Sequence, residues 1–181
     1  MIGNGLETEI IEIFREDITR LLSINQIAKK LGKSYPYIHK KVNEFIDEGI
    51  FKTKKIGNSI LCTINLQNEE ARAFLIINEV LHKKKVLKNN PEIKNKLEEI
   101  EELKEKNHIW TVIQNSNHTI IISEEKKEFK GFKVLNKEEF QQQVFKDYSL
   151  IKDHTILYHH EEYYEIIGEI EDKLRNKQLM P

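Results

Sequence analysis

Aromatic, basic and amide side chains crowd one stretch of the chain, from Ser34 to Gly49, with the sequence SYPYIHKKVNEFIDEG. Hydroxyl, imidazole, amide and ammonium groups bind phosphates and the edges of nucleic-acid bases. Acidic residues come only at the end of the stretch, so its beginning is better suited to a polyanion. The polar residues at the beginning are Tyr35, Tyr37, His39, Lys40, Lys41 and Asn43.

Apolar residues in the same stretch predict that it is a helix, because they recur at the spacing of one helical face. They are Ile38, Val42, Phe45 and Ile46. Ser34 is a good N-cap residue, and we expect its side-chain oxygen to accept a bond from a first-turn N–H group. Pro36 is tolerated in the first turn, and Gly49 ends the helix.

The elements on either side predict how this helix is held. The segment INQIAKKL, residues 24–31, is an amphipathic helix with Ser23 as its N-cap, and Gly32-Lys33 is a joint short enough for a helix-turn-helix. A further helix precedes it, with Leu6, Ile10, Ile13 and Phe14 on one face. After Gly49 the period becomes two, and strands 50–56 and 59–66 flank the hairpin signal Gly57-Asn58. We expect one face of the second strand to hold Ile60, Cys62, Ile64 and Leu66.

The whole segment 24–66 resembles winged-helix domains of archaeal and bacterial transcriptional regulators. The matching residues are Ala28, Leu31, Gly32, Ser34 and Gly49, and Pro36 departs from the pattern. The resemblance implies that the first turns of helix 34–48 enter the DNA major groove and that the hairpin, or wing, contacts phosphates or the minor groove. The implied groove residues are Ser34, Tyr35, Tyr37, His39 and Lys40, and the implied wing contacts are Lys54, Lys55 and Asn58.

The charge distribution agrees with this interpretation. Residues 20–66 contain nine Lys and Arg against three Asp and Glu, a net +6, whereas the counts from Gln67 onward are 19 and 22, a net −3. A basic segment in a near-neutral chain is typical of a DNA-binding domain, in which Lys40 and Lys41 neutralise phosphates. Two alternatives stay open: the lysines form only a solvated face, or the domain binds protein.

Composition also bears on location. Cys62 is the only cysteine, so neither an internal disulfide nor a cysteine-cluster metal site can form. No signal peptide and no membrane-spanning stretch are visible, and we expect a cytoplasmic protein without a membrane partner.

Two long helices are expected in the middle of the chain, at 67–88 and at about 91–106, separated by Asn89-Asn90-Pro91. The first has Asn68 as its cap and an apolar stripe of Phe74, Ile77, Val80, Leu81 and Leu87. Because operators are often two-fold symmetric, this stripe suggests a homodimer contact, although it could equally cover both domains of one chain.

From His108 the pattern predicts strands at 109–114, 119–123 and 132–135. A helix follows from Asn136 to Phe145, then an apolar element at 150–158 and a final helix at 161–177. The segments Leu135–Phe140 and Ile156–Tyr158, with Tyr163 and Tyr164, are similar to the ends of small archaeal nucleotidyltransferase-like domains. Active members need a Gly-Ser turn and paired acidic residues, and Trp110–Ser123 contains neither. The resemblance therefore implies a degenerate domain, and we expect no catalytic residues and no cofactor. A metal site of His154, His159 and Glu162 is disfavoured, because adjacent residues of one element point apart.

Together these patterns predict an α+β protein: an N-terminal winged helix-turn-helix (1–66), connecting or dimerisation helices (67–107) and a small C-terminal α/β domain (108–181). The predicted function is that of a transcriptional regulator, which binds double-stranded DNA sequence-specifically as a homodimer and takes a small-molecule or protein effector at its C-terminal domain. The alternatives are a winged-helix-targeted nucleotidyltransferase, or other nucleic-acid-modifying enzyme, and a protein-interaction adaptor.

Overall fold

The protein has an α+β fold, seen in a computed structural model that describes residues 5–115, 118–125 and 127–178. The chain divides into two compact units. Unit 1 comprises Met1–Asn78 and Lys173–Pro181, and unit 2 comprises Glu79–Asp172. Helix α4 (Glu69–Asn89) contributes to both units, and α8 (Glu171–Gln178) contributes to unit 1.

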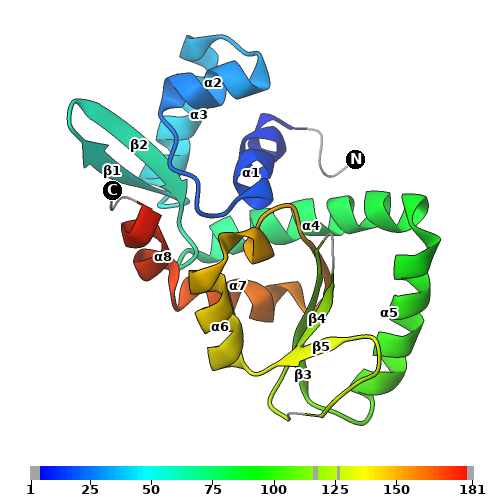
Figure 1. Ribbon diagram of the computed structural model, residues 1–181. Helices are drawn as coiled ribbons and strands as arrows, with labels where there is room; N and C mark the ends of the chain where they lie inside the picture. The colour runs from blue at the N-terminus through cyan, green and yellow to red at the C-terminus, as the bar shows by residue number, and fades with distance from the viewer. Residues whose placement is uncertain (1–4, 116–117, 126, 179–181) are drawn as a thin grey trace. The chain divides into compact units, whose positions relative to one another are not determined.

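Unit 1 contains three helices followed by a hairpin (Figure 1). The helices are α1 (Leu6–Glu16), α2 (Ile24–Leu31) and α3 (Tyr35–Asp47), and the strands are β1 (Phe51–Ile56) and β2 (Ser59–Ile64). The strands pair antiparallel from Phe51↔Ile64 to Ile56↔Ser59, as the Gly57-Asn58 signal predicted. Leu22 adds a backbone bridge to Cys62, which ties the segment before α2 to the hairpin.

The core of unit 1 fixes the direction of α3. Ile38, Val42 and Phe45 are buried, and the Phe45 ring meets the Phe51 ring edge-on at 5.3 Å. Cys62 lies in the same core, and burial raises the pKa of its thiol to about 11, so it remains protonated and unreactive. Because this face of α3 is buried, its polar face must point to solvent.

The two N-caps around the turn between α2 and α3 differ from each other. Ser23 forms a full capping box with Gln26, whereas Ser34 stands at the N-cap of α3 without a side-chain cap bond. The expectation that Ser34 caps the helix through its hydroxyl is therefore wrong. Pro36 is the second helical residue and has no N–H group, which removes one of the donors that a cap would satisfy. Gly32, at φ +63°, supplies the left-handed end of α2.

Unit 2 is built on a four-stranded sheet in the order β5-β4-β3-β6. Its strands are β3 (Ile109–Gln114), β4 (Thr119–Ser123), β5 (Lys133–Leu135) and β6 (Thr155–Tyr158). Only β4 and β5 are parallel; the other neighbours are antiparallel. The helices are α5 (Pro91–Lys104), α6 (Lys137–Lys146) and α7 (His160–Gly168), with a short 3₁₀ helix at Tyr148–Ile151.

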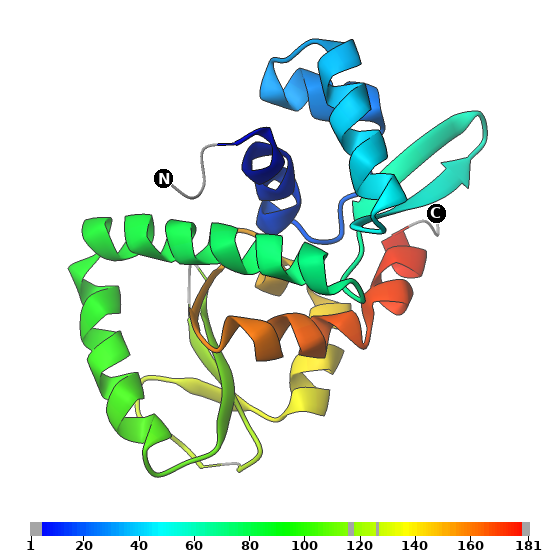
Figure 2. The ribbon, with the colours of Figure 1, turned by 180° about the vertical axis from the view of Figure 1, so that it is seen from behind.

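Helices cover both faces of this sheet (Figures 1 and 2). On one face, Ile100 of α5 packs with Val112, Ile121 and Leu157. The other face meets α6 and α7, whose Phe140 and Tyr163 rings are fully buried. All residues of β4 are buried, as expected for a central strand covered on both sides.

Three expectations for helices and strands are corrected. The buried side of α4 carries Ala71, Leu75, Asn78 and Glu79, whereas Ile77 and Val80 of the expected stripe are exposed. The expected final helix is broken into α7 and α8 after Gly168, a residue of low helix propensity. The expected apolar element at 150–158 divides into the 3₁₀ helix and β6.

Candidate nucleic-acid interface

Three polar side chains of α3 form a row along its exposed side. Tyr35, His39 and Asn43 are spaced four residues apart and therefore lie above one another. The rings of Tyr35 and His39 are 5.4 Å apart, and Nδ2 of Asn43 lies 3.2 Å from Nδ1 of His39. The imidazole is thus held between a ring and an amide, and the row presents hydroxyl, ring and amide groups in fixed order.

This row forms one wall of a groove of about 540 Å³, here called the α3 groove. The beginning of α2 and the hairpin supply the other walls. Its lining contains amide, hydroxyl, ring and aliphatic groups but no Lys, Arg, Asp or Glu. The lining residues are Ser23, Ile24, Asn25, Tyr35, His39, Asn43, Ile46, Thr53, Asn58 and Ile60.

Of the residues predicted to bind DNA, the structure brings Tyr35, His39 and Asn58 together in the α3 groove. Ser34, Tyr37, Lys40 and Lys55 are exposed but do not line it. These four lie on exposed parts of unit 1 outside the groove lining. The predicted DNA-binding residues therefore fall into two groups, those that line the groove and those exposed elsewhere on unit 1.

The lysines of unit 1 differ in what they already bind. Nζ of Lys41 lies 2.8 Å from a Glu7 oxygen and 2.6 Å from a Glu44 oxygen. Hydrogen bonding to Glu44 and Glu7 raises the pKa of Lys41, and the same bond lowers the pKa of Glu7. Lys33 pairs with Glu9 at 2.9 Å. The charges of Lys33 and Lys41 are therefore compensated within the domain.

The hairpin lysines also differ from each other. Nζ of Lys54 donates to Oδ1 of Asn176 in α8 at 3.1 Å, whereas Lys55 on the other face is exposed. Arg175 of α8 donates to the carbonyl of Ile64, so α8 braces the back of the hairpin. Among the described residues, Lys29, Lys30, Lys40 and Lys55 are exposed and form no ion pair.

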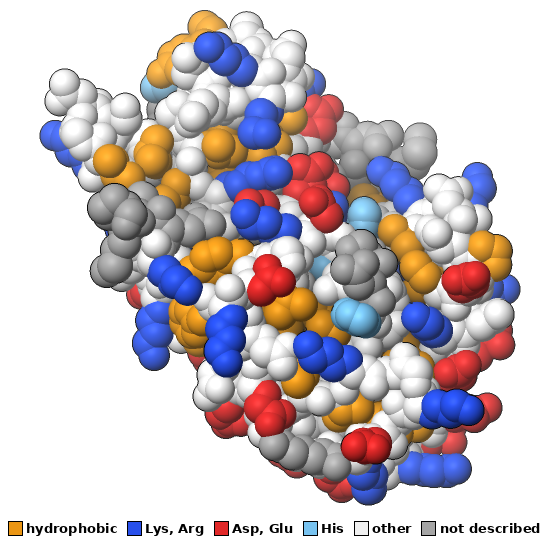
Figure 3. Space-filling model, viewed as in Figure 1, with side chains coloured by type: hydrophobic (Ala, Val, Ile, Leu, Met, Phe, Trp, Pro, Cys, Tyr) orange, Lys and Arg blue, Asp and Glu red, His pale blue; other side chains and the backbone are white. Residues whose placement is uncertain are grey.

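The surface over α2, α3 and the hairpin mixes lysine or arginine side chains with hydrophobic ones and a histidine (Figure 3). The exposed hydrophobic residues include Tyr35, Tyr37, Ile56 and Ile60. Ile60 was expected to be buried with Cys62 and Ile64, but it is 59% exposed, because the hairpin extends beyond the core at that point. It forms an apolar wall of the α3 groove instead.

Sequence reasoning missed several residues of the groove. Asn25, Thr53 and Ile60 were not candidates, although each follows from the predicted elements. Asn25 is in the first turn of α2, and Thr53 and Ile60 lie on the same face of the hairpin, since Thr53 pairs with Cys62, two residues after Ile60. A prediction of the hairpin register would have identified the last two.

Unit 2 contains a second group of polar side chains, here called the β6 seam: Glu79, His82 and Lys83 of α4 with His160 of α7. Strand β6 has a neighbouring strand on one side only. Glu79 accepts from the N–H of Ile156 at 3.5 Å, His160 bonds the carbonyl of Ile156, and Lys83 donates to the carbonyl of Leu157. The seam thus satisfies backbone groups that the sheet leaves unpaired.

Burial lowers the pKa of two members of this seam, His160 and Lys83. Burial first, and then the positive charges of Lys83 and His159, lower the pKa of His160 to about 4. Burial likewise lowers the pKa of Lys83. Glu79 is completely buried, and its other oxygen lies 3.5 Å from Oη of Tyr164. Because every one of these groups is directed at other parts of unit 2, the seam holds the unit together.

The disfavoured metal ligands are not assembled. Nδ1 of His159 lies 3.5 Å from Oε1 of Glu162, while His154 is buried against the Tyr163 ring. Within the part of the chain that the structure describes, no three His, Cys, Asp or Glu side chains are grouped to hold a metal ion.

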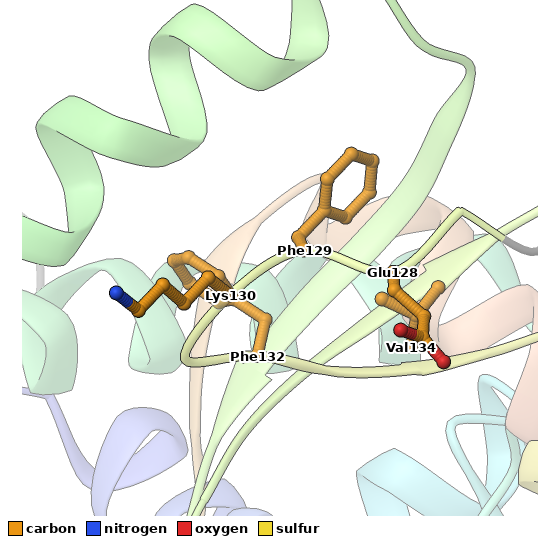
Figure 4. Close-up of a pocket in the computed structure, with 5 residues that line it drawn as sticks. All are labelled: Glu128, Phe129, Lys130, Phe132 and Val134. Carbon is orange, nitrogen blue, oxygen red and sulfur yellow. The ribbon is translucent and has the colours of Figure 1, made fainter.

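A cavity of about 580 Å³ lies beside β5 in unit 2 (Figure 4). Its walls are Phe129, Phe132 and Val134, with Glu128 and Lys130 at its edge. Figure 4 shows the Lys130 ammonium directed away from the Glu128 carboxylate. The lining thus combines three apolar side chains with one acidic and one basic side chain that do not converge.

Comparison with known proteins adds no relative: no protein-family model, curated protein or solved structure matches the chain. Among the described residues, none of the helices combines the length and apolar composition required to cross a bilayer.

Proposed function

We propose that unit 1 is a winged-helix domain that binds double-stranded DNA and that the protein is a transcriptional regulator. In this proposal α3 is the recognition helix and the β1–β2 hairpin is the wing. The observation that carries it is the α3 groove, a concave surface lined by uncharged polar and aliphatic groups, on a unit that also carries exposed lysines.

Exposed lysines and an uncharged groove match the two kinds of contact that a DNA duplex offers, to phosphates and to base edges. Lys29, Lys30, Lys40 and Lys55 are available for phosphates, whose neutralisation supplies most of the affinity. The amide and ring groups of the groove remain available for base edges, which supply specificity. The resemblance of residues 24–66 to winged-helix domains of regulators gives independent support.

The experiment is a duplex-binding titration of the full chain at about 50 and about 200 mM salt. We expect binding that weakens steeply with salt, and a Lys55→Ala variant whose slope of log K against log salt is smaller by about 1. Lys33→Ala serves as the matched control, since that ammonium is already paired with the Glu9 carboxylate. Absence of duplex binding at the lower salt concentration would overturn the proposal.

One observation favours a second candidate, a protein-interaction adaptor. Ile60 in the groove, and Ile56 and Tyr37 outside its lining, are large apolar side chains that remain exposed on unit 1. Such surface is typical of protein-binding sites as well. The adaptor would show no duplex binding, or binding indifferent to salt, and the titration above therefore separates the two candidates.

Assembly and regulation remain predictions of the same proposal. A homodimer would match a two-fold symmetric operator, and the exposed Ile77 and Val80 of α4 offer apolar contact for it. The cavity beside β5 is where we place a small-molecule or protein effector. Sedimentation velocity of the purified chain tests the dimer.

A further inference from the structure

The absence of charge inside the α3 groove restricts which bases it can read. Guanine is recognised in the major groove mainly by Arg or Lys, and cytosine by Asp or Glu. None of these residue types lines the groove. Adenine is recognised by Asn or Gln, and the groove contains Asn25, Asn43 and Asn58.

Apolar groups in the groove match the partner of adenine. The thymine methyl group is the one apolar group on the major-groove edge of a base pair, and it is recognised by aliphatic side chains. Ile60 and Thr53 face the groove from the hairpin, opposite the row on α3. The groove therefore combines amide groups for adenine with aliphatic groups for thymine.

The Asn43 amide lies against the edge of His39, with its Nδ2 3.2 Å from one ring nitrogen and 3.3 Å from the other. The His39 ring in turn lies against Tyr35. One N–H of the amide is used by the contact with His39, which leaves the second N–H and the carbonyl oxygen for a ligand. A donor and an acceptor side by side are what the N7 and N6 positions of adenine require.

We infer that the α3 groove selects A·T base pairs, with Asn43 reading adenine and Ile60 contacting the thymine methyl group. The inference rests on the proposed function and adds the base preference of the same site. Lys40 and the other exposed lysines then contribute affinity without selecting a sequence.

The first experiment compares full-length protein on duplexes of equal length composed of alternating A·T or alternating G·C pairs. We expect binding to the A·T duplex to be at least about tenfold tighter. Equal binding would overturn this inference and leave the proposed function standing, whereas no binding to either duplex would overturn both.

The second experiment separates base reading from recognition of DNA shape. Replacing adenine by 7-deazaadenine removes the N7 acceptor but keeps base pairing, and we expect the wild type to lose about tenfold in affinity. Asn43→Ala should bind the two duplexes equally, and Lys30→Ala, the matched control, should keep the wild-type ratio. A deaza effect that persists in Asn43→Ala would overturn the role of Asn43.

The third experiment tests the apolar wall. Replacing thymine by uracil removes only the methyl group, and we expect a loss of about threefold in the wild type and none in Ile60→Ser. Because Ile60 is exposed, this substitution leaves the core intact. Equal sensitivity to uracil in both proteins would overturn the contact.

Discussion

The α3 groove and the β6 seam each contain a row of polar side chains spaced along one helix, yet the two rows differ in what surrounds them. Tyr35, His39 and Asn43 project from α3 into a groove open to solvent. Glu79, His82 and Lys83 project from α4 onto the edge of β6, where Oε2 of Glu79 and Nζ of Lys83 meet backbone groups. The row on α3 therefore keeps hydrogen-bonding groups available for a ligand, whereas the groups on α4 already bond to other parts of the protein.

The difference shows that residue type and spacing do not by themselves mark a functional site. A buried polar group must be satisfied within the protein, because leaving it unpaired costs about 1–3 kcal/mol. An exposed group pays no such cost and can exchange water for a ligand. Burial therefore separates a binding row from a structural one, and removal of either row should have different consequences.

The largest effect is expected on removing the carboxylate of the seam. Glu79→Ala leaves the buried N–H of Ile156 and the hydroxyl of Tyr164 without this acceptor, and we expect unit 2 to lose about 3 kcal/mol of stability. Trp110, the only tryptophan of the chain, lies in β3 and reports on unit 2 during urea unfolding monitored by fluorescence.

The control for this substitution is Lys84→Ala on the exposed side of α4, which should change stability by less than about 0.5 kcal/mol. Glu79→Gln retains an acceptor and should fall between the two. A loss below about 1 kcal/mol in Glu79→Ala would mean that the seam does not hold unit 2 together.

The next effect is a dependence on pH that arises from His160. Its pKa is lowered from 6.5 to about 4 in the folded protein, so the unfolded chain binds more protons between these values. Stability contributed by the neutral imidazole is therefore present above pH 6.5 and is lost as the pH falls toward 4. Between pH 6.5 and about pH 4.5 we expect the wild type to lose about 2 kcal/mol more than His160→Gln, measured by Trp110 fluorescence in urea. Parallel pH profiles for the two proteins would contradict this assignment.

Sequence patterns predicted the elements of unit 1 well, because local chemistry defines them. The Ser23 capping box, Gly32 and Gly57-Asn58 each act within a few residues of the boundary that they set. The prediction of which face of α4 is buried was wrong, because Asn78 and Glu79 are polar residues that are nevertheless buried. Asn78 donates to the carbonyl of Phe74 one turn earlier in α4. Glu79 meets the Ile156 N–H of β6 and the Tyr164 hydroxyl of α7, which no local pattern reveals.

The candidate site was predictable in part for the same reason. The helical face of Tyr35 and His39 follows from the period of α3, so their placement in the groove could be anticipated. The difference between Lys40 and Lys41 could not, because it depends on Glu7 in α1, a long way back in the chain. Similarly, the contact of Lys54 with α8 depends on residues at the opposite end of the sequence.

The smallest effect is expected on duplex binding, from comparing substitutions of the neighbouring residues Lys40 and Lys41. Lys40→Ala removes an exposed charge and should weaken duplex binding about fivefold, with a salt slope smaller by about 1. Lys41→Ala removes the same formal charge but one already paired with Glu7 and Glu44, so we expect less than about a twofold change in binding. Its stability should fall by about 0.5 kcal/mol, as for surface ion pairs, measured by circular dichroism.

The opposite change frees the Lys41 ammonium by removing one of its carboxylate partners. Glu7→Gln weakens the pairing of Lys41 and, although Glu44 remains, should strengthen binding in the wild type but not in the Lys41→Ala background. Glu7 lies in α1 and does not line the α3 groove. A gain confined to the wild-type background would therefore come from the released ammonium of Lys41, whereas a gain that persists in the Lys41→Ala background would come from the lost carboxylate charge. Equal losses of binding in Lys40→Ala and Lys41→Ala would show instead that total charge, and not the availability of each ammonium, determines affinity.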